Sequence, residues 1–236
     1  MKKLAVVLFV LATLLSCDSR GRYRIAGECR GASDGDIVTL SYSNDGRHLH
    51  EIDKCEIKDG KFFFDGHVED CKLCYIGNES RQTPLYIMFF LEEGDMAVEY
   101  SGTDGVVTGT RSNDLYKAAT DSMECFMESL DRIEEEMAHS NDNAVKDSLS
   151  LAGYDLQCRI TEYIYNTVND NIDNLFGLYM LVVYNEFFDA DELKELIKRI
   201  PESSIDRRNN SLYDLIVEIE AIRSRPASFE EMLFDI

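Results

Sequence analysis

Two cysteines separated by two residues suggest redox chemistry in the segment Cys71-Lys72-Leu73-Cys74. A working Cys-x-x-Cys site places its first sulfur at a helix N-terminus, where the dipole and the free amides lower the thiol pKa. This pair instead stands between Gly66-His67-Val68 and Tyr75-Ile76, which both read as strand. In an extended segment, α-carbons three residues apart lie about 10 Å from each other, beyond the roughly 7 Å limit for a disulfide. The pattern favours a structural role for both cysteines, with a catalytic dithiol as the alternative.

Two histidines at alternate positions, His48 and His50, would lie on one face of a strand, a spacing that metal sites use. No third ligand is identifiable, although Glu51, Asp53 and His67 belong to the same half of the chain. The acidic segments 34–36, 141–143 and 170–173 miss the alternating ligands of a calcium loop and read as turns or helix caps. The sequence therefore predicts no metal site.

A complete catalytic constellation is not visible. Glu134-Glu135-Glu136 would serve a glycosidase only with a second carboxylate at a set separation in a cleft, and charge runs are normally solvated helix faces. The chain has no Gly-x-Ser-x-Gly elbow, no phosphate-binding loop and no dinucleotide fingerprint. It also has no tryptophan, and most of its tyrosines and phenylalanines follow core spacing, so no sugar-stacking platform is predicted. We predict no catalytic residue and no cofactor, and lean towards a non-enzymatic protein.

The N-terminus has the order of a secretory signal peptide. A basic start at Lys2 and Lys3 precedes the apolar run 4–15, and a small residue, Ser16, precedes Cys17. The run is shorter than the roughly 20 residues that span a bilayer, so cleavage is expected instead of a retained transmembrane helix. Leu14-Leu15-Ser16-Cys17 resembles the lipobox of bacterial lipoproteins, in which the cysteine sulfur is acylated before the cut. We predict that Cys17 carries the lipid anchor, because several acyl chains on one residue attach a protein stably.

The composition limits the partners. Loss of Lys2 and Lys3 with the leader leaves 22 Lys and Arg against 45 Asp and Glu, so the formal charge changes from −21 to −23. Such a surface repels nucleic acid and anionic headgroups, and we expect no nucleic-acid partner. With Cys17 assigned to the lipid, six cysteines remain, in a compartment that permits disulfides without requiring them, and the sequence assigns no connectivity.

Short strands separated by turn signals occupy the first half of the chain. The candidates are 23–30, 37–42, 48–57, 61–64, 72–76, 85–91, 96–100 and 106–107. Asp59-Gly60 supplies the positive φ angles of a type I′ hairpin turn. The continuously apolar run 85–91 predicts a central strand with both faces covered.

After Gly109 the apolar period becomes helical. Asn113 is predicted to cap a first helix, and a second follows Asn141-Asp142-Asn143 with Tyr163 and Thr167 at the end of its apolar stripe. Two such stripes predict an antiparallel helical hairpin. A buried helix over 175–188 and amphipathic helices over 191–200 and 211–223 complete the expected elements, and Met232-Leu233-Phe234 is a candidate tail that packs back on the last helix.

The expected fold class is α+β. Residues 1–16 form the signal peptide, 17–22 a lipidated tether, 23–110 an antiparallel β-sandwich or barrel, and 111–236 an all-helical segment.

This order of parts resembles the domain of unknown function 4369, found at the N-terminus of many lipoproteins of Bacteroides and its relatives. The likeness covers roughly residues 23–120 and is carried by Tyr23-Arg24-Ile25-Ala26-Gly27, Ile52-Asp53, the hairpin 58–66, the run 89–95 and the segments 107–110 and 113–116. In many relatives a thioredoxin-like domain with a Trp-Cys-x-x-Cys site follows. The chain ends at Ile236 without a tryptophan, so we expect the architecture and the compartment of the family without its redox domain.

These observations lead to two function hypotheses. The first is a membrane-anchored binding or scaffold module of the cell envelope with a protein partner. The alternative is an accessory of thiol–disulfide exchange that acts through Cys71 and Cys74 or beside a separate thioredoxin-like protein. Asp18 favours inner-membrane retention by the rule for enteric bacteria, but the resemblance to Bacteroides lipoproteins leads us to expect the outer membrane.

Overall fold

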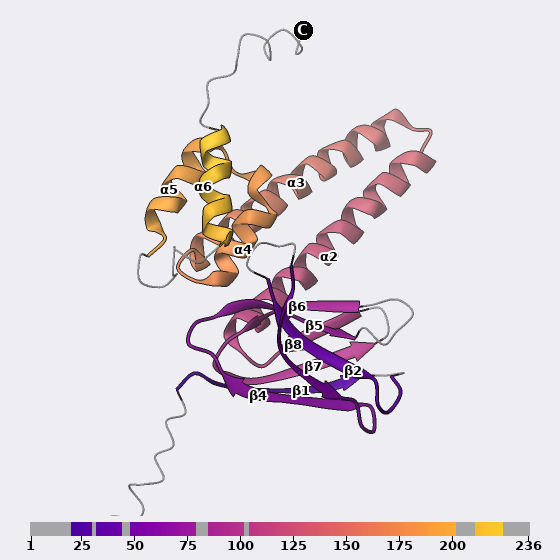
Figure 1. Ribbon diagram of the computed structural model, residues 1–236. Coiled ribbons are helices and arrows are strands. Elements are labelled where there is room, and N and C mark those ends of the chain that lie inside the picture. The colour runs from indigo at the N-terminus through magenta and orange to yellow at the C-terminus, as the bar shows by residue number, and fades with distance from the viewer. Residues whose placement is uncertain are drawn as a thin grey trace, which may run out of the picture. The chain divides into compact units, whose positions relative to one another are not determined.

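The computed structural model describes residues 20–29, 32–43, 48–78, 85–101, 104–201 and 211–223. They divide into two compact units, one from the described parts of residues 1–41 and 51–110, the other from residues 42–50 and the described part of residues 111–223 (Figure 1). A β-sandwich is followed by helices, which confirms the predicted α+β fold class. The predicted signal peptide, Cys17, Asp18 and the tail 232–234 lie outside the described residues.

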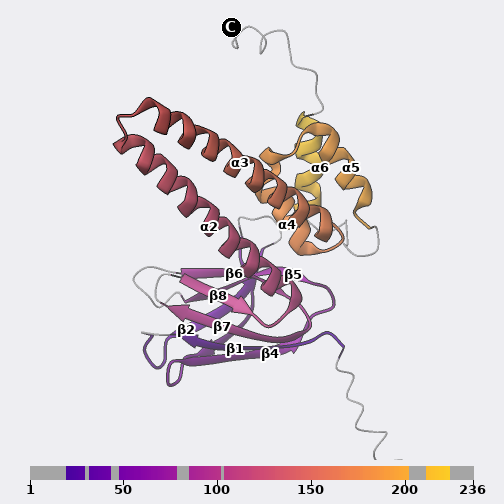
Figure 2. The same cartoon turned by 180° about the vertical axis from the view of Figure 1, so that it is seen from behind.

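The strands form two four-stranded sheets, which Figures 1 and 2 show from opposite sides. One sheet has the order β4-β1-β7-β8 and the other the order β3-β2-β5-β6. The strands are β1 (Arg22–Cys29), β2 (Ile37–Tyr42), β3 (His50–Glu56), β4 (Lys61–His67), β5 (Lys72–Asn78), β6 (Leu85–Leu91), β7 (Gly94–Ser101) and β8 (Asp104–Thr108). Each predicted strand is present, with the ends of several shifted by a few residues.

One strand pairing differs from the antiparallel arrangement that we expected. Strand β1 is antiparallel to β4 but parallel to β7, so the first sheet is mixed. A parallel neighbour requires a long crossover, and here the chain runs through the whole second sheet between the two strands. The alternation of buried and exposed residues along β1 and β7 predicts which face of each strand is buried. It does not predict whether the two strands run parallel or antiparallel.

Alternating side chains build the core between the sheets. Along β1, Tyr23, Ile25 and Cys29 are buried, whereas Arg22 and Arg24 face solvent. This follows from the two-residue period of a strand, which places successive side chains on opposite faces. The same rule buries phenylalanines from both sheets, so the core is aromatic at its centre, with Phe62, Phe64 and Phe89.

The Asp59-Gly60 turn carries the chain from β3 of one sheet to β4 of the other. Asp59 has φ 52° and Gly60 has φ 71°, which confirms the predicted type I′ geometry. Lys58 and Lys61 exchange backbone hydrogen bonds of 3.0 and 2.9 Å across it. The preceding Ile57 is buried, and its amide donates to Asp36 O at 2.8 Å. Backbone hydrogen bonds therefore fix both the turn itself and the residue that precedes it.

Strand β6 is not the central strand that its apolar sequence predicts. It lies at an edge of the second sheet, beside β5. Its C-terminal half is nevertheless buried on both faces, because Phe89 and Phe90 are both inaccessible, whereas Tyr86 near its start is 43 % exposed. Strand β8 of the other sheet lies close by: a Cβ on Gly105 would come within 2.1 Å of Ile87 Cδ1. The absence of a side chain there lets Ile87 pack against β8 and closes this side of the sandwich.

The second unit contains a helical hairpin and a cluster of shorter helices (Figure 1). The hairpin consists of α2 (Arg111–His139) and α3 (Asn143–Asn171), which confirms the predicted pair. Asp142 caps α3 by accepting a hydrogen bond from Ala144 N at 2.9 Å. The remaining helices are α4 (Leu175–Val183), the 3-10 turn η1 (Asn185–Phe187), α5 (Ala190–Arg199) and α6 (Ser211–Arg223).

Two helical details were predicted wrongly. Asn113 is not an N-cap, since α2 already begins at Arg111, after the chain turns at Gly109 with φ 100°, and Asn113 is buried in the first turn. The fully buried stripe of α3 ends on Ile164 and Val168, whereas Tyr163 and Thr167 are half-buried, and Tyr163 packs against Phe126 of α2. The buried stripe runs in steps of four because α4 also packs against the C-terminal half of α3.

Candidate functional site

An open groove of about 1100 Å³ lies on the outer face of the first sheet, at the end nearest the Asp59-Gly60 turn. Ala26 and Ala97 form its floor and Phe63 stands at one wall. Strand β3 supplies Cys55, and the segment before the Asp59-Gly60 turn supplies Lys58 on that side. All of these residues belong to the first unit, so the strand register alone determines how they meet.

The floor exists because small residues occupy neighbouring outward positions. Phe63 of β4 pairs with Ala26 of β1, and Ala26 pairs in turn with Ala97 of β7. Phe63 is 51 % exposed, although its neighbours Phe62 and Phe64 are buried. Three consecutive phenylalanines in a strand must place at least one ring on the solvent side. The result is an exposed aromatic ring beside two methyl groups.

Rows of charged side chains flank the apolar row of Phe63, Ala26 and Ala97 on both sides. In one, Arg24 binds Asp95 through two hydrogen bonds of 2.6 and 2.7 Å. In the other, Lys61 lies 3.5 Å from Glu28, whose register partner on β7 is Glu99. The hydrogen bonds from Arg24 hold the pKa of the Asp95 carboxyl below its usual value, so this border stays ionised. The groove therefore has an apolar floor and a rim that carries both signs of charge.

Cys55 is the thiol in the groove wall. Burial raises its pKa, an effect that outweighs a hydrogen bond from the backbone of Phe63. A thiolate is the nucleophilic form of cysteine, and a raised pKa keeps the group protonated at neutral pH. The groove is thus suited to binding, and its thiol is not activated for attack.

The structure places Cys71 and Cys74 in a strand context. Cys71 precedes β5, and Cys74 lies within β5 opposite Phe89 of β6. Cys74 is fully buried, and burial raises its pKa to about 12. Cys74 carries a free thiol. A helix N-terminus that would lower the thiol pKa is missing here, so the geometry favours the structural interpretation.

The candidate metal ligands are dispersed. His48 precedes β3, while exposed His50 begins it, with its ring 5.3 Å from that of Tyr42. His67 lies on β4, in a different sheet from Glu51 and Asp53. Among the residues that the structure describes, no three His, Cys, Asp or Glu side chains gather as metal ligands.

The acidic run Glu134-Glu135-Glu136 lies exposed on α2, as expected of a solvated helix face. Of the helices within the described ranges, none has the length and hydropathy needed to span a bilayer.

Sequence reasoning did not identify the groove. The strand over 61–64 was predicted, but the outward position of Phe63 was not used as a signal. An outward phenylalanine facing two outward alanines is recognisable only when the pairing of β4, β1 and β7 is known. The parallel β1–β7 pairing was the missing information.

Comparison with known families bears on this region. Residues 23–116 match the model of a family described as "Domain of unknown function (DUF4369)". No curated protein and no solved structure matches the chain. The groove lies entirely within the matched segment, whereas α3 and the later helices lie outside it.

Proposed function

Since residues 23–116 form a DUF4369 domain, we propose that the protein is a non-enzymatic binding module of the bacterial cell envelope, anchored in a membrane by acyl chains on Cys17. The groove on the first sheet supports the binding role. The lipobox-like Leu14-Leu15-Ser16-Cys17 supports the anchor and hence the compartment, with the outer membrane as the proposed site.

The groove fits an extended segment of a protein partner. Its open shape and flat floor of Ala26 and Ala97 suit a peptide laid across the strands, because enclosed cavities are the usual sites of small ligands. An apolar side chain of the peptide would contact Phe63, and its charged neighbours would meet the rim. Aromatic side chains of this kind supply much of the binding energy at protein interfaces.

Site-specific photo-crosslinking tests the binding role. Phe63 is replaced by the photo-reactive benzoylphenylalanine in cells that make the native protein, with exposed Glu69 as the matched control position. We expect a discrete protein adduct from position 63 and none from position 69. The added change Ala97→Arg fills the floor and should abolish the adduct. Equal adducts from both positions, or an adduct that survives Ala97→Arg, would contradict the proposal.

Fractionation tests the anchor separately. Cys17→Ser removes the acylated sulfur, so the protein should leave the membrane fraction and lose incorporation of a labelled fatty acid. Separation of the two membranes on a density gradient then identifies which one holds the unaltered protein. A Cys17→Ser variant that stays in the membrane with its label would show that another segment is the anchor.

A further inference from the structure

One carboxylate on the outer face of the first sheet has no cation to pair with. The three basic side chains that β4, β1 and β7 present on this face each form an ion pair with a carboxylate of the same face: Arg22 with Asp65, Arg24 with Asp95 and Lys61 with Glu28. In the described part of the chain, Glu99 is the one outward Asp, Glu, Lys or Arg of these three strands that forms no ion pair. The cations of this face are therefore all engaged, and one negative charge remains.

Glu99 stands beside a second carboxylate, that of Glu28. The two residues are register partners on the parallel strands β7 and β1, whose backbones lie about 4.8 Å apart. Like charges on neighbouring strands destabilise a sheet. Lys61 approaches Glu28 from the β4 side, but the two side chains are 69 % and 61 % exposed, so their contact contributes little. A cation placed between Glu28 and Glu99 would remove the repulsion.

These two carboxylates form one border of the groove. Ala26 and Ala97 precede them by two residues on the same strands, and the two-residue period of a strand keeps all four side chains on one face. The carboxylates therefore lie about 7 Å along the strands from the apolar floor. A Lys or Arg close to the apolar residue of a bound peptide spans this gap, because its side chain is long and flexible.

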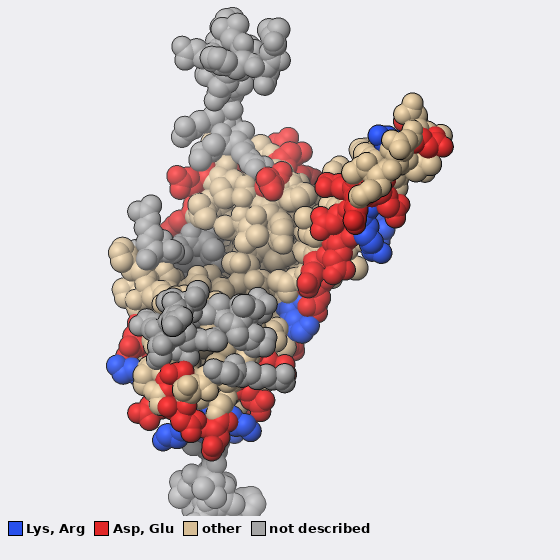
Figure 3. All heavy atoms as spheres, turned by 90° about the vertical axis from the view of Figure 1, so that its right-hand side faces the viewer, with Lys and Arg blue, Asp and Glu red and all other residues tan. Residues whose placement is uncertain are grey.

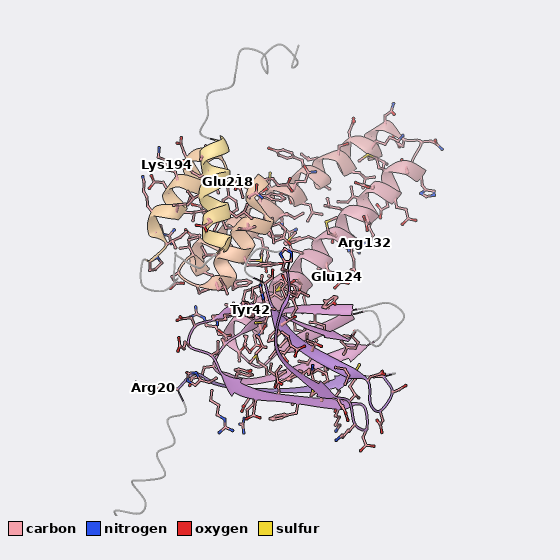
Figure 4. All side chains as sticks on the ribbon, viewed as in Figure 1. Arg20, Tyr42, Glu124, Arg132, Lys194 and Glu218 are labelled. Atoms are coloured by element: carbon pink, nitrogen blue, oxygen red, sulfur yellow. The ribbon has the colours of Figure 1, made fainter. Side chains whose placement is uncertain are left out.

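The excess of negative charge belongs to this border. On the opposite border the carboxylates are neutralised by Arg22 and Arg24. On the β3 side, Lys58 and Glu56 line the groove with opposite charges and add nothing to the sum. Figure 3 shows acidic and basic side chains close together on one face of the first unit, and Figure 4 shows side chains that project from β1 and β4 away from the second sheet. A peptide bound in the groove therefore meets uncompensated charge at Glu99.

We infer that the groove selects an extended peptide in which a Lys or Arg lies within two residues of an apolar side chain. The apolar side chain contacts Phe63 and the alanine floor, and the cation lies between Glu28 and Glu99. A peptide with Asp or Glu at that position is disfavoured, because it would bring a third negative charge to the same border. The inference rests on the proposed binding role of the groove and specifies the chemistry of its partner.

Selection from a peptide library tests the inference on residues 18–236, which contain every described residue. The probe is a collection of random seven-residue peptides displayed on phage, selected in about 0.15 M salt, where long-range attraction is screened. We expect the recovered peptides to combine an apolar residue with Lys or Arg within two positions. Ala97→Arg fills the floor and should recover none of them. Glu99→Lys should reverse the preference towards Asp and Glu.

A matched pair of variants measures the effect of the single carboxylate. One recovered peptide is labelled with fluorescein, and fluorescence anisotropy gives its affinity. Glu99→Gln should weaken binding about fivefold. Glu69→Gln, the same change of charge at an exposed position outside the groove, should leave the affinity unchanged. Glu99→Gln should also keep the melting temperature or raise it slightly, because it removes a like-charge contact, whereas a role in folding would lower it.

The outcomes separate this inference from the proposed function. Peptides that require the intact floor but carry no Lys or Arg preference would overturn the inference and leave the binding role of the groove in place. Equal affinities for Glu99→Gln and Glu69→Gln would overturn it too. Recovery of the same peptides by Ala97→Arg, or of no peptide by the unaltered chain, would contradict both the inference and the binding role.

Discussion

The β-sandwich and the helical hairpin bury very different shares of their residues. Strand β1 buries every second residue against the opposite sheet. In α2, by contrast, only three of 29 residues are buried, namely Ser112, Asn113 and Ala119. The sandwich therefore takes its stability from a shared core, and the distal hairpin takes it from the seam between two helices. A region that needs little of its surface for stability leaves the rest of that surface for recognition.

The seam of the hairpin is nonetheless specific. Phe126 of α2 and Tyr163 of α3 meet edge to face with ring centroids 5.6 Å apart, and Arg159 lies 6.0 Å from the same Phe126 ring. Aromatic pairs of this kind contribute about 0.5–1.5 kcal/mol beyond burial, and exposed cation–π contacts about 0.5–1 kcal/mol. These contacts align the two helices and leave the outer face of α3 uncovered.

The largest expected difference between the regions is thiol reactivity. Burial raises the pKa of Cys74 in the sandwich from the ordinary 9.0 to about 12, which lowers its thiolate fraction about a thousandfold. Cys74 should react with iodoacetamide at least that much more slowly than exposed Cys125 of the hairpin, as followed by mass spectrometry of digested protein. Raising the pH should speed alkylation of Cys74 until about pH 12.

The same thiols decide between binding and thiol exchange. With Cys74 protonated, the chain should not reduce insulin, and Cys71→Ser should behave like the unaltered chain. Insulin turnover that disappears in Cys71→Ser would establish the redox alternative and refute the non-enzymatic proposal.

The next largest difference between the two regions should be the loss of unfolding free energy when a side chain is truncated. Phe89→Ala removes a fully buried ring from the sandwich core and should cost about 3–5 kcal/mol of unfolding free energy. Leu151→Ala removes an exposed side chain of the hairpin and should change it by less than about 0.5 kcal/mol. Urea denaturation measures both. Similar losses would mean that Leu151 is packed in the folded protein.

Two helical glycines give a sharper test within the second unit. A Cβ at Gly177 of α4 would lie 1.8 Å from Asn171 O, so Gly177→Ala should cost about 1–3 kcal/mol. At Gly153 of α3 the nearest atom, Ile133 Cγ2, is 3.8 Å from the added Cβ, so Gly153→Ala should stabilise by about 0.5–1 kcal/mol. Thermal unfolding should show shifts of opposite sign, and a shift in the same direction would contradict the packing described for α4.

The smallest effect is expected at the rim of the groove. Arg24 lowers the folded-state pKa of Asp95 below its ordinary 3.8, mainly through their hydrogen bonds. The contribution of a carboxyl with a depressed pKa is present above its unfolded value and is lost as the pH falls through the folded value. Asp95→Asn should therefore lower the melting temperature slightly at pH 7, where the carboxylate contributes, and should match the unaltered chain at low pH, where both side chains are neutral. Its profile below about pH 4 should be flatter, and the whole effect should be small in salt because the pair is exposed. An unchanged acid limb would show that the ion pair does not persist in solution.

Local chemistry was sufficient to predict much of this fold. Alternating residues in β1, the Asp59-Gly60 turn and the Asp142 cap each follow from the preferences of a few neighbouring residues, and the structure confirms them. The edge position of β6 did not follow from its sequence, because burial of Phe90 depends on strands that are distant in the chain. The groove was missed for the same reason, since its floor is produced by a parallel pairing.

The seam of α3 shows a second limit. A single stripe was predicted from spacing, yet the helix has one face for α2, a second for α4 and an exposed third. Spacing within one helix does not say which of several apolar stripes is covered. That choice depends on the neighbouring helices.

The proposed compartment, and with it the access of the groove to envelope partners, depends on how the N-terminus is processed. The most direct measurement is the intact mass and N-terminal peptide of protein purified from native membranes. We expect a chain that begins at Cys17 and carries acyl groups on that residue. A chain that begins at Met1, or a free thiol at Cys17 in soluble protein, would contradict the lipid-anchored account.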